Sequence, residues 1–283
     1  MTAEERDRLL VPLDGSLPGG DALAAASAVG ELADAELDVI YVSDPPVATE
    51  EVARRAQIPD EWRARVRLHS ASGEAGEAIV RSARELGASA IVLSSHGATR
   101  NLTEPAGHVT LDVLRDPPCP VYVLPSTVTL RAQERRLRHM RRILIPLDGT
   151  AEANQAVAYA ADVAVRAHAR LLMLHVVDQN PAVARVRIAP RYSDQSHHEL
   201  EAWRHEFQRR GFASTHRPEA LRSEAVLRVG DPATVINDYA NEQDCDLIVS
   251  AWGGSLSPGR AKVVRALLSR ARCPLLFLRA ESA

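Results

Sequence analysis

The chain has 283 residues, of which 46% are hydrophobic and 25% charged, and its formal net charge is −3. This is the composition of a globular protein, and the length suggests about two domains of ordinary size. The mildly acidic balance gives no overall attraction to nucleic acid or to an anionic membrane, so neither is expected as a partner. The charged N-terminus lacks the apolar core of a secretory signal, and no apolar run is long enough to span a bilayer. A cytoplasmic protein is therefore expected.

In the first half, short apolar runs alternate with stretches of helical periodicity. Strands are predicted at residues 9–13, 37–42, 66–68, 90–93 and 121–124. Helices are predicted at 21–33, 74–86 and 107–114, with a polar helical segment inside 44–65 that ends near Trp62. Alternating strands and helices predict right-handed crossovers and a parallel sheet with helices on both faces.

The second half repeats this order. Strands are predicted at 143–147, 171–177, 224–229, 247–250 and 275–278, helices at 152–167, 232–241 and 261–269, and a longer insert at 178–222. The run Val11-Pro12-Leu13-Asp14-Gly15 recurs as Ile145-Pro146-Leu147-Asp148-Gly149, and Cys119-Pro120 recurs as Cys273-Pro274. Such self-similarity indicates a duplication, so a site at these strand ends would exist in two copies.

The duplication divides the chain into a first domain at 1–127, a linker at 128–140 and a second domain at 141–283. The linker region carries Arg131, Arg135, Arg136 and Arg138. These arginines could form a patch for anions or nucleic acid. A solvated linker helix is favoured, because the protein as a whole is acidic.

Candidate ligand-binding residues lie after the first and fourth strands of the first half. In an open parallel sheet, ligands bind beyond the carboxyl ends of the strands where the strand order reverses. The fourth strand is followed by a polar loop with Gly97, and Gly107 opens the next helix. Glycines let backbone N–H groups approach an anion, and a helix N-terminus favours negative charge. The loop is the outline of a phosphate site.

Taken together, these motifs resemble the universal stress protein family in its tandem form. The resemblance is carried by the Pro-Leu-Asp-Gly run of each half, by Gly230-Asp231-Pro232, by Ser95-His96-Gly97 and by the two Cys-Pro pairs. It implies two tandem Rossmann-like or flavodoxin-like α/β units, each a five-stranded parallel sheet with helices on both faces. The family pairs its last strands, which implies an internal pseudo-dimer here and leaves a further homodimer open.

The nucleotide-binding branch of the family carries the pattern Gly-x2-Gly-x9-Gly-(Ser/Thr) around ATP phosphates. In this chain Gly97 and Gly107 match, whereas Ser94 and His108 depart from the pattern. The resemblance implies that Asp14 faces adenosine and that Val42 lines the adenine pocket. The implied ligand is ATP, with magnesium, or a related adenine nucleotide. The full set of implied contacts is Pro12, Asp14, Val42, Ser94, Gly97, Gly107, His108, Val109 and Thr110.

The second half offers weaker candidates at Asp148, Val176, Ala251, Gly254 and Lys262. Its loop is shorter and lacks the last glycine, so it is not expected to wrap a triphosphate. Lys262 could still hold an anion as a point charge. A structural alternative stays open in both halves: the glycines would serve turns and helix starts, and the two aspartates would cap their own turns.

The function implied is that of a non-catalytic, nucleotide-responsive stress regulator with no catalytic residue. Ligand binding would order residues 98–106 and change a surface read by a protein partner that the sequence does not name. An interaction or dimerisation module without nucleotide is the main alternative, motivated by Ser94 and the divergent second half. A slow ATPase or a nucleotidyl transferase is less favoured, because no positioned base or pair of metal carboxylates emerges.

Three further features are interpreted as structural. His197, Glu201 and His205 share one helix face at metal-binding spacing, but they lie in an insert that is polar all round, so a solvated face is favoured and no metal site is expected. Cys119 and Cys273 precede strands and are expected to be reduced core thiols. His96 is assigned to the architecture of its loop before any role as a general base.

Overall fold

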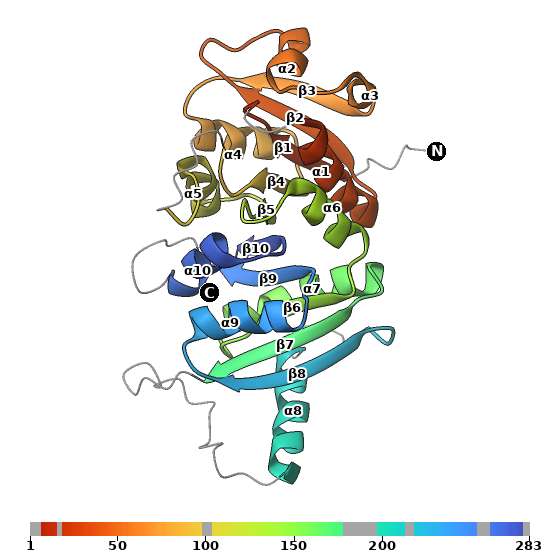
Figure 1. Cartoon of the computed structure of the whole chain (residues 1–283), viewed down its shortest axis with the longest axis vertical. Helices are drawn as coiled ribbons and strands as arrows, with labels where there is room; N and C mark the ends of the chain where they lie inside the picture. Colours follow the sequence, from red (N-terminus) through yellow and green to blue (C-terminus); the bar gives the residue numbers. More distant parts are fainter. Residues whose placement is uncertain are drawn as a thin grey trace.

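The computed structural model describes residues 7–15, 19–97, 104–177, 197–212, 218–253 and 261–279 (Figure 1). No helix within these ranges is long and apolar enough to cross a membrane. In chain order the elements are β1 (Arg8–Pro12), α1 (Gly19–Ala33), β2 (Glu36–Val42), α2 (Thr49–Arg55), α3 (Asp60–Arg63), β3 (Val66–Ala71), α4 (Ala75–Glu85), β4 (Ala90–Ser94), α5 (His108–Arg115), β5 (Val121–Leu124), α6 (Leu130–Arg138), β6 (Arg142–Pro146), α7 (Ala151–Arg166), β7 (Arg170–Val177), α8 (His197–Gly211), β8 (Arg222–Val229), α9 (Pro232–Glu242), β9 (Leu247–Trp252), α10 (Lys262–Arg270) and β10 (Leu275–Arg279).

Several helices begin at a short polar side chain that caps their first turn. Helix α7 starts where the Thr150 hydroxyl accepts a hydrogen bond from the Ala153 N–H at 3.2 Å, and α6 starts in the same way at Thr129. Helix α9 starts at Asp231, whose carboxylate accepts from the Thr234 N–H at 3.1 Å. These caps satisfy N–H groups that have no partner inside the helix, so they determine where each helix begins.

The ten strands within the described ranges form one sheet in the order β3-β2-β1-β4-β5-β10-β9-β6-β7-β8 (Figure 1). Each neighbouring pair is parallel except β5 and β10, which run antiparallel where the two halves meet. In that pair Val123 lies opposite Leu275, and Val121 lies opposite Phe277. The predicted fold class is confirmed: two tandem α/β units pair through their last strands within one chain.

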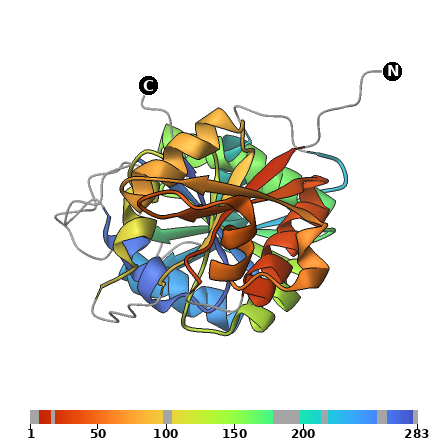
Figure 2. The same cartoon turned by 90° about the horizontal axis from the view of Figure 1, so that it is seen from above.

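Helices cover both faces of the sheet, as the view from above shows (Figure 2). One hydrophobic core packs α1, α6 and α7 against the strands, and the other packs α4, α5, α9 and α10. In β1, Leu9 and Val11 belong to the first core and Leu10 to the second, because successive side chains of a strand point to opposite faces. Both cores contain residues of both halves, so the halves form one packed body.

The segment between the halves is a docked helix rather than the solvated linker helix that the sequence favoured. Leu137 of α6 is 1% exposed. Arg138 pairs with Glu31 of α1, and Arg136 pairs with Asp244 of the second half at 2.9 Å. Most of the arginines of α6 therefore bind carboxylates of the chain itself, a use that composition alone could not reveal.

Three other stretches differ from the sequence prediction. The polar segment at 44–65 forms two short helices, α2 and α3. Strand β3 continues to Ala71 instead of ending at residue 68, because pairing with β2 holds polar residues that carry little strand signal of their own. The insert helix α8 is not polar all round, since Phe207 within it is buried, as is Phe212 directly after its end.

A charged residue is buried in the sheet of the first half. Asp38 of β2 is 1% exposed and accepts hydrogen bonds from Nε and Nη2 of Arg8, both at 2.8 Å. The Nε2 atom of His69 lies 2.5 Å from the same carboxylate. Burial tends to raise the pKa of Asp38, but the hydrogen bonds from Arg8 and His69 outweigh it and hold that pKa below its ordinary value. The ionised carboxylate thereby joins β1, β2 and β3.

Candidate functional site

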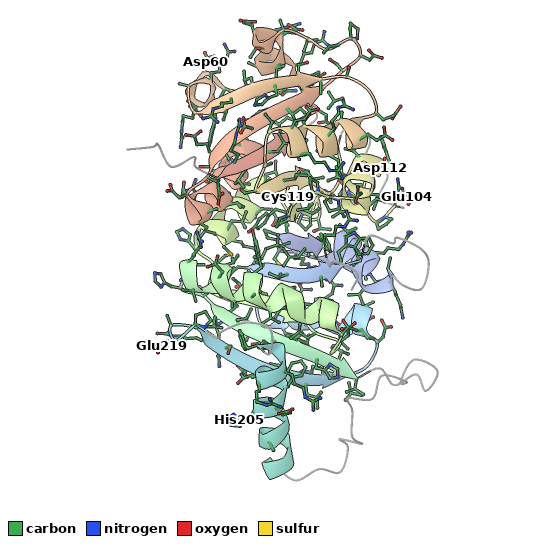
Figure 3. The ribbon with its side chains drawn as sticks, turned by 180° about the vertical axis from the view of Figure 1, so that it is seen from behind. Asp60, Glu104, Asp112, Cys119, His205 and Glu219 are labelled. Atoms are coloured by element: carbon green, nitrogen blue, oxygen red, sulfur yellow. The ribbon has the colours of Figure 1, made fainter. Side chains whose placement is uncertain are left out.

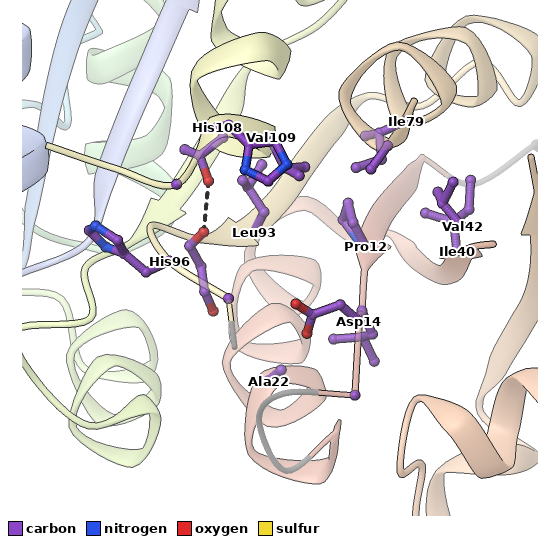
Figure 4. Close-up of a pocket in the computed structure, with 17 residues that line it drawn as sticks. Pro12, Asp14, Ala22, Ile40, Val42, Ile79, Leu93, His96, His108 and Val109 are labelled. Carbon is purple, nitrogen blue, oxygen red and sulfur yellow. Dashed lines mark hydrogen bonds between the residues drawn. The ribbon is translucent and has the colours of Figure 1, made fainter. Parts of the chain in front are cut away.

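A cavity of about 200 Å³ opens at the carboxyl ends of the first-half strands (Figure 4). It lies over β1, β2 and β4 and is bordered by the N-terminal turns of α4 and α5. Strands β2 and β4 flank β1, and the chain crosses from one side of β1 to the other after β3. The strand order therefore reverses at this point, which is where open α/β sheets bind ligands.

The first-half residues that the sequence named as nucleotide contacts all line this one cavity: Pro12, Asp14, Val42, Ser94, Gly97, Gly107, His108, Val109 and Thr110. The other lining residues were not named as contacts: Leu13, Gly15, Ala22, Ile40, Ala75, Ile79, Leu93 and His96. Strand periodicity could have found Ile40, which precedes Val42 by two residues and so shares its face. The residues from α1 and α4 could not have been found, because only the tertiary structure places those helices beside the strands.

One part of the cavity is apolar. Ile40, Ile79 and Leu93 are each buried, and Val42 is half-buried beside them (Figure 4). Asp14 is exposed and adds a carboxylate to the lining. A pocket with an apolar floor and few polar groups is the usual setting for a small organic ligand.

Helix α5 begins at the wall of the cavity with a glycine at its N-cap, which has no side chain that could cap the helix. Its N-cap residue Gly107 has φ −62° and ψ 153°. The first hydrogen bond within the helix runs from the Leu111 N–H to the Gly107 carbonyl at 3.1 Å. The N–H groups of His108, Val109 and Thr110 therefore have no acceptor inside the helix. Such groups, together with the helix dipole, favour an anion at this end.

Two glycines of the cavity wall, Gly15 and Gly107, have different structural roles. Gly15 has φ +75°, and a Cβ atom there would lie 2.2 Å from the Arg55 carbonyl oxygen, so the backbone requires glycine. At Gly107 a Cβ atom would meet its nearest neighbour, the Ser95 carbonyl oxygen, at 3.6 Å, which is an ordinary contact. The backbone at 107 therefore tolerates a side chain. The glycine leaves room at the cavity wall.

Hydrogen bonds fix the loop between β4 and α5. The Thr110 hydroxyl donates to the Ser94 carbonyl at 3.0 Å, the dashed line of Figure 4. His96 is buried, with Nδ1 3.1 Å from the Ser126 hydroxyl and Nε2 3.3 Å from the Glu104 carbonyl. Because both of its ring nitrogens contact the protein, His96 holds the loop against the end of β5, in keeping with the structural role expected for it.

In the second half, the charged candidate residues Asp148 and Lys262 form hydrogen bonds and an ion pair within the protein. The Asp148 carboxylate accepts hydrogen bonds from the Thr150 N–H at 2.9 Å and from the Thr150 hydroxyl at 2.7 Å, which closes the turn before α7. Lys262, in the first turn of α10, pairs with Asp231 at the start of α9. The hydrogen bond from Lys262 holds the pKa of Asp231 below its ordinary value. These contacts match the structural alternative for Asp148.

The apolar candidates of the second half lie at strand ends. Val176 is half-buried near the end of β7. Ala251 is half-buried within β9, opposite Leu278 of β10, because β9 continues through Trp252. Gly254 lies outside the residues that the structure describes. Sequence reasoning thus named a coherent cavity lining in the first half and residues with structural contacts in the second.

The structure describes the surroundings of two cysteines and of one of the histidines considered as metal ligands. Burial raises the pKa of Cys119 and of Cys245 to about 12, which keeps these free thiols protonated and unreactive. Among the side chains that the structure describes, no group of three or more His, Cys, Asp or Glu residues could hold a metal ion. His205 is exposed on α8 (Figure 3), while the side chains of His197 and Glu201 lie outside the described part.

Comparison with known proteins finds the same family in each half of the chain. The model of the universal stress protein family matches the chain twice, at residues 5–125 and 139–279. The chain belongs to the universal stress protein family. Because the match occurs once in each half, the protein is a tandem member of that family.

Solved structures share the whole arrangement. A universal stress protein from Archaeoglobus fulgidus DSM 4304 superposes with a TM-score of 0.64 at 15% identity, over 98% of this chain and 97% of that one. A candidate member from Pseudomonas aeruginosa UCBPP-PA14 gives 0.66 at 16% identity, over 98% and 94%. A protein of unknown function from Pseudomonas aeruginosa PAO1 gives 0.65 at 17% identity, over 98% and 93%. At these identities the likeness shows the fold alone. A search of curated proteins finds no match.

Proposed function

We propose that this universal stress protein binds ATP or a related adenine nucleotide in the cavity of its first half and acts as a nucleotide-responsive regulator. The observation that carries the proposal is that one cavity is bordered by an apolar pocket and by a helix N-terminus whose N-cap is glycine. A nucleotide needs both environments, because its base is flat and largely apolar whereas its phosphates are anionic. The proposed role in the stress response is based on membership of the universal stress protein family.

Each part of the lining has a role in this proposal. Val42 and its buried neighbours would pack against the adenine ring, and Asp14 would accept hydrogen bonds from the adenosine part. The N–H groups of His108, Val109 and Thr110 would receive a phosphate, with the Gly107 wall leaving space for it. ATP would enter as its magnesium complex with the metal held by phosphate oxygens, because Asp14 is the one carboxylate in the lining that the structure describes.

The proposal assigns binding rather than catalysis. Phosphoryl transfer uses a positioned base and metal-holding carboxylates beside the phosphates. In the described lining, His96 is engaged in the loop, and one carboxylate is present. We expect one nucleotide per chain, because Asp148 and Lys262 of the second half are engaged in contacts of their own.

Calorimetric titration of the whole chain with Mg-ATP tests the proposal. We expect saturable heat with a stoichiometry near one and a raised melting temperature. Gly107→Trp should abolish both, because a bulky side chain there starts at the cavity wall. Arg265→Trp, at an exposed position of α10, is the matched control and should bind like the wild type.

The same experiment separates the competing functions. No heat and no thermal shift at millimolar Mg-ATP would support an interaction module without nucleotide. Formation of ADP by the wild type at a rate clearly above that of Gly107→Trp would support a slow ATPase instead of a purely regulatory protein.

A further inference from the structure

Helix α5 connects the cavity of the first half to the second half of the chain. It has 8 residues, which corresponds to a length of about 12 Å. His108, Val109 and Thr110 at its N-terminal end line the cavity. Its C-terminal end contacts residues of the second half. Because the helix is short and contacted at both ends, ligand binding at its N-terminal end can change its contacts at the C-terminal end.

Trp252 of the second half caps the C-terminal end of α5. Its indole N–H donates a hydrogen bond to the carbonyl of Leu114. That carbonyl is among the last four of α5, which have no donor inside the helix. Trp252 lies at the end of β9 and is 4% exposed, so the hydrogen bond forms in a buried setting. In the duplicated pattern Trp252 takes the place that Ser95 holds in the first half, so the contact breaks the symmetry of the repeat.

An ion pair supports the same end of the helix. Asp116, the residue that follows α5, pairs with Arg84 of α4 at 2.7 Å and with Arg279 of β10. A carboxylate at a helix C-terminus is unfavourable, because it adds to the negative end of the dipole. Arg279 offsets this charge from the second half. The pair is exposed, so the buried indole contact is the stronger of the two.

We propose that Trp252 couples occupancy of the cavity to the packing of the two halves through α5. A helix of this length is marginal by itself and depends on contacts at its ends. An anion at the N-terminal end and the indole at the C-terminal end stabilise the same helical state, so each strengthens the other, and the coupling is reciprocal. The inference rests on the proposed nucleotide binding and extends it by naming the route to the second half.

The first measurement follows Trp252 itself. The full chain, which has three tryptophans, is labelled with 5-fluorotryptophan, and the fluorine resonance of Trp252 is assigned by its loss in Trp252→Phe. We expect that resonance to shift during titration with Mg-ATP, with the same midpoint as the calorimetric heat. Trp252 does not line the cavity, so direct contact with the ligand does not account for such a shift.

The second measurement tests the reverse effect, that of contacts at the C-terminal end of α5 on the affinity for Mg-ATP. Trp252→Phe should weaken Mg-ATP binding about five-fold, at the lower end of typical coupling. Arg279→Gln, an exposed change that keeps the test valid if Trp252→Phe folds poorly, should weaken binding by a smaller factor. Arg270→Gln, at an exposed position of α10, is the matched control and should leave affinity unchanged.

The outcomes separate the two proposals. A coincident shift together with weaker binding in both variants supports the coupling. Heat of binding with an unmoved Trp252 resonance, and with wild-type affinity in both variants, overturns the coupling and leaves the nucleotide site standing. No heat with the wild-type protein overturns both.

Discussion

The cavity wall allows a matched comparison of alanine substitutions at Gly15 and Gly107. At Gly15 a side chain meets two penalties. A residue other than glycine at φ +75° costs about 1–2 kcal/mol. In addition, the Cβ atom would lie 2.2 Å from the backbone oxygen of Arg55, so the backbone of the turn or of α2 has to move. We expect Gly15→Ala to lose at least about 2 kcal/mol of unfolding free energy.

At Gly107 the same change should be nearly neutral. The backbone φ of −62° suits any residue, and the nearest atom to the new Cβ is 3.6 Å away. Alanine is a poorer N-cap than glycine by roughly 0.5–1 kcal/mol, but it reduces the entropy of the unfolded chain by about 0.4–1 kcal/mol. The two effects offset each other, so we expect a change within about 0.5 kcal/mol.

Urea unfolding followed by circular dichroism, together with thermal melts, measures both variants. Gly15→Ala should melt about 4–8 °C below the wild type, and Gly107→Ala within about 2 °C of it. Equal destabilisation of the two variants would refute the reasoning, because it would mean that the backbone also needs glycine at 107. The space at that position would then say nothing about a ligand.

Three further predictions concern stability. Asp38→Asn should lose about 3 kcal/mol at pH 7, because Arg8 keeps a largely buried charge without its partner. The folded pKa of Asp38 lies below its ordinary value of 3.8, so this stabilisation is complete above pH 3.8 and is lost as pH falls through the folded pKa. The gap between wild type and variant in urea unfolding should therefore shrink on acidification, and a constant gap would contradict the assignment. Phe277→Ala should lose about 3–5 kcal/mol of unfolding free energy, because Phe277 is 1% exposed in the β5–β10 pair. It should destabilise both halves together. Separate unfolding of the halves, measured by hydrogen exchange, would argue against one continuous packed body. Thr150→Ala should cost about 1 kcal/mol through loss of the α7 cap, which thermal melts can detect, and an unchanged melting temperature would show that the cap is not needed.

The two copies of the repeat have diverged in the first-half cavity lining and in the loop beside it, and at the corresponding positions of the second half. His108, exposed at the start of α5, corresponds to Lys262, which pairs with Asp231 in the second half. Ser95, part of the loop network in the first half, corresponds to Trp252 at the interface. One copy keeps an open cavity lining, whereas the corresponding residues of the other hold the structure together. A duplicated fold can divide its roles in this way because each copy supports the other through a shared sheet.

Local sequence patterns and the family resemblance predicted the number, order and type of most elements and nine of the residues that line the first-half cavity. Period-two apolar runs, helical periodicity and the turn residues after β1 and β4 are local signals, and the duplication showed each of them twice. Parallel strands bring their carboxyl ends to one edge, so Asp14 and Gly107 could be placed together without coordinates, whereas Val42 was implied by the resemblance to the family.

Contacts between distant segments could be known only from the folded chain. The docking of α6, the burial of Asp38 between Arg8 and His69, and the capping of α5 by Trp252 join residues that no local pattern connects. The same holds for the α1 and α4 walls of the cavity and for the ion pair of Lys262. Burial and pairing are set by which elements pack together, and a polar or charged side chain carries the same local signal whether it lies in solvent or meets a partner across the fold.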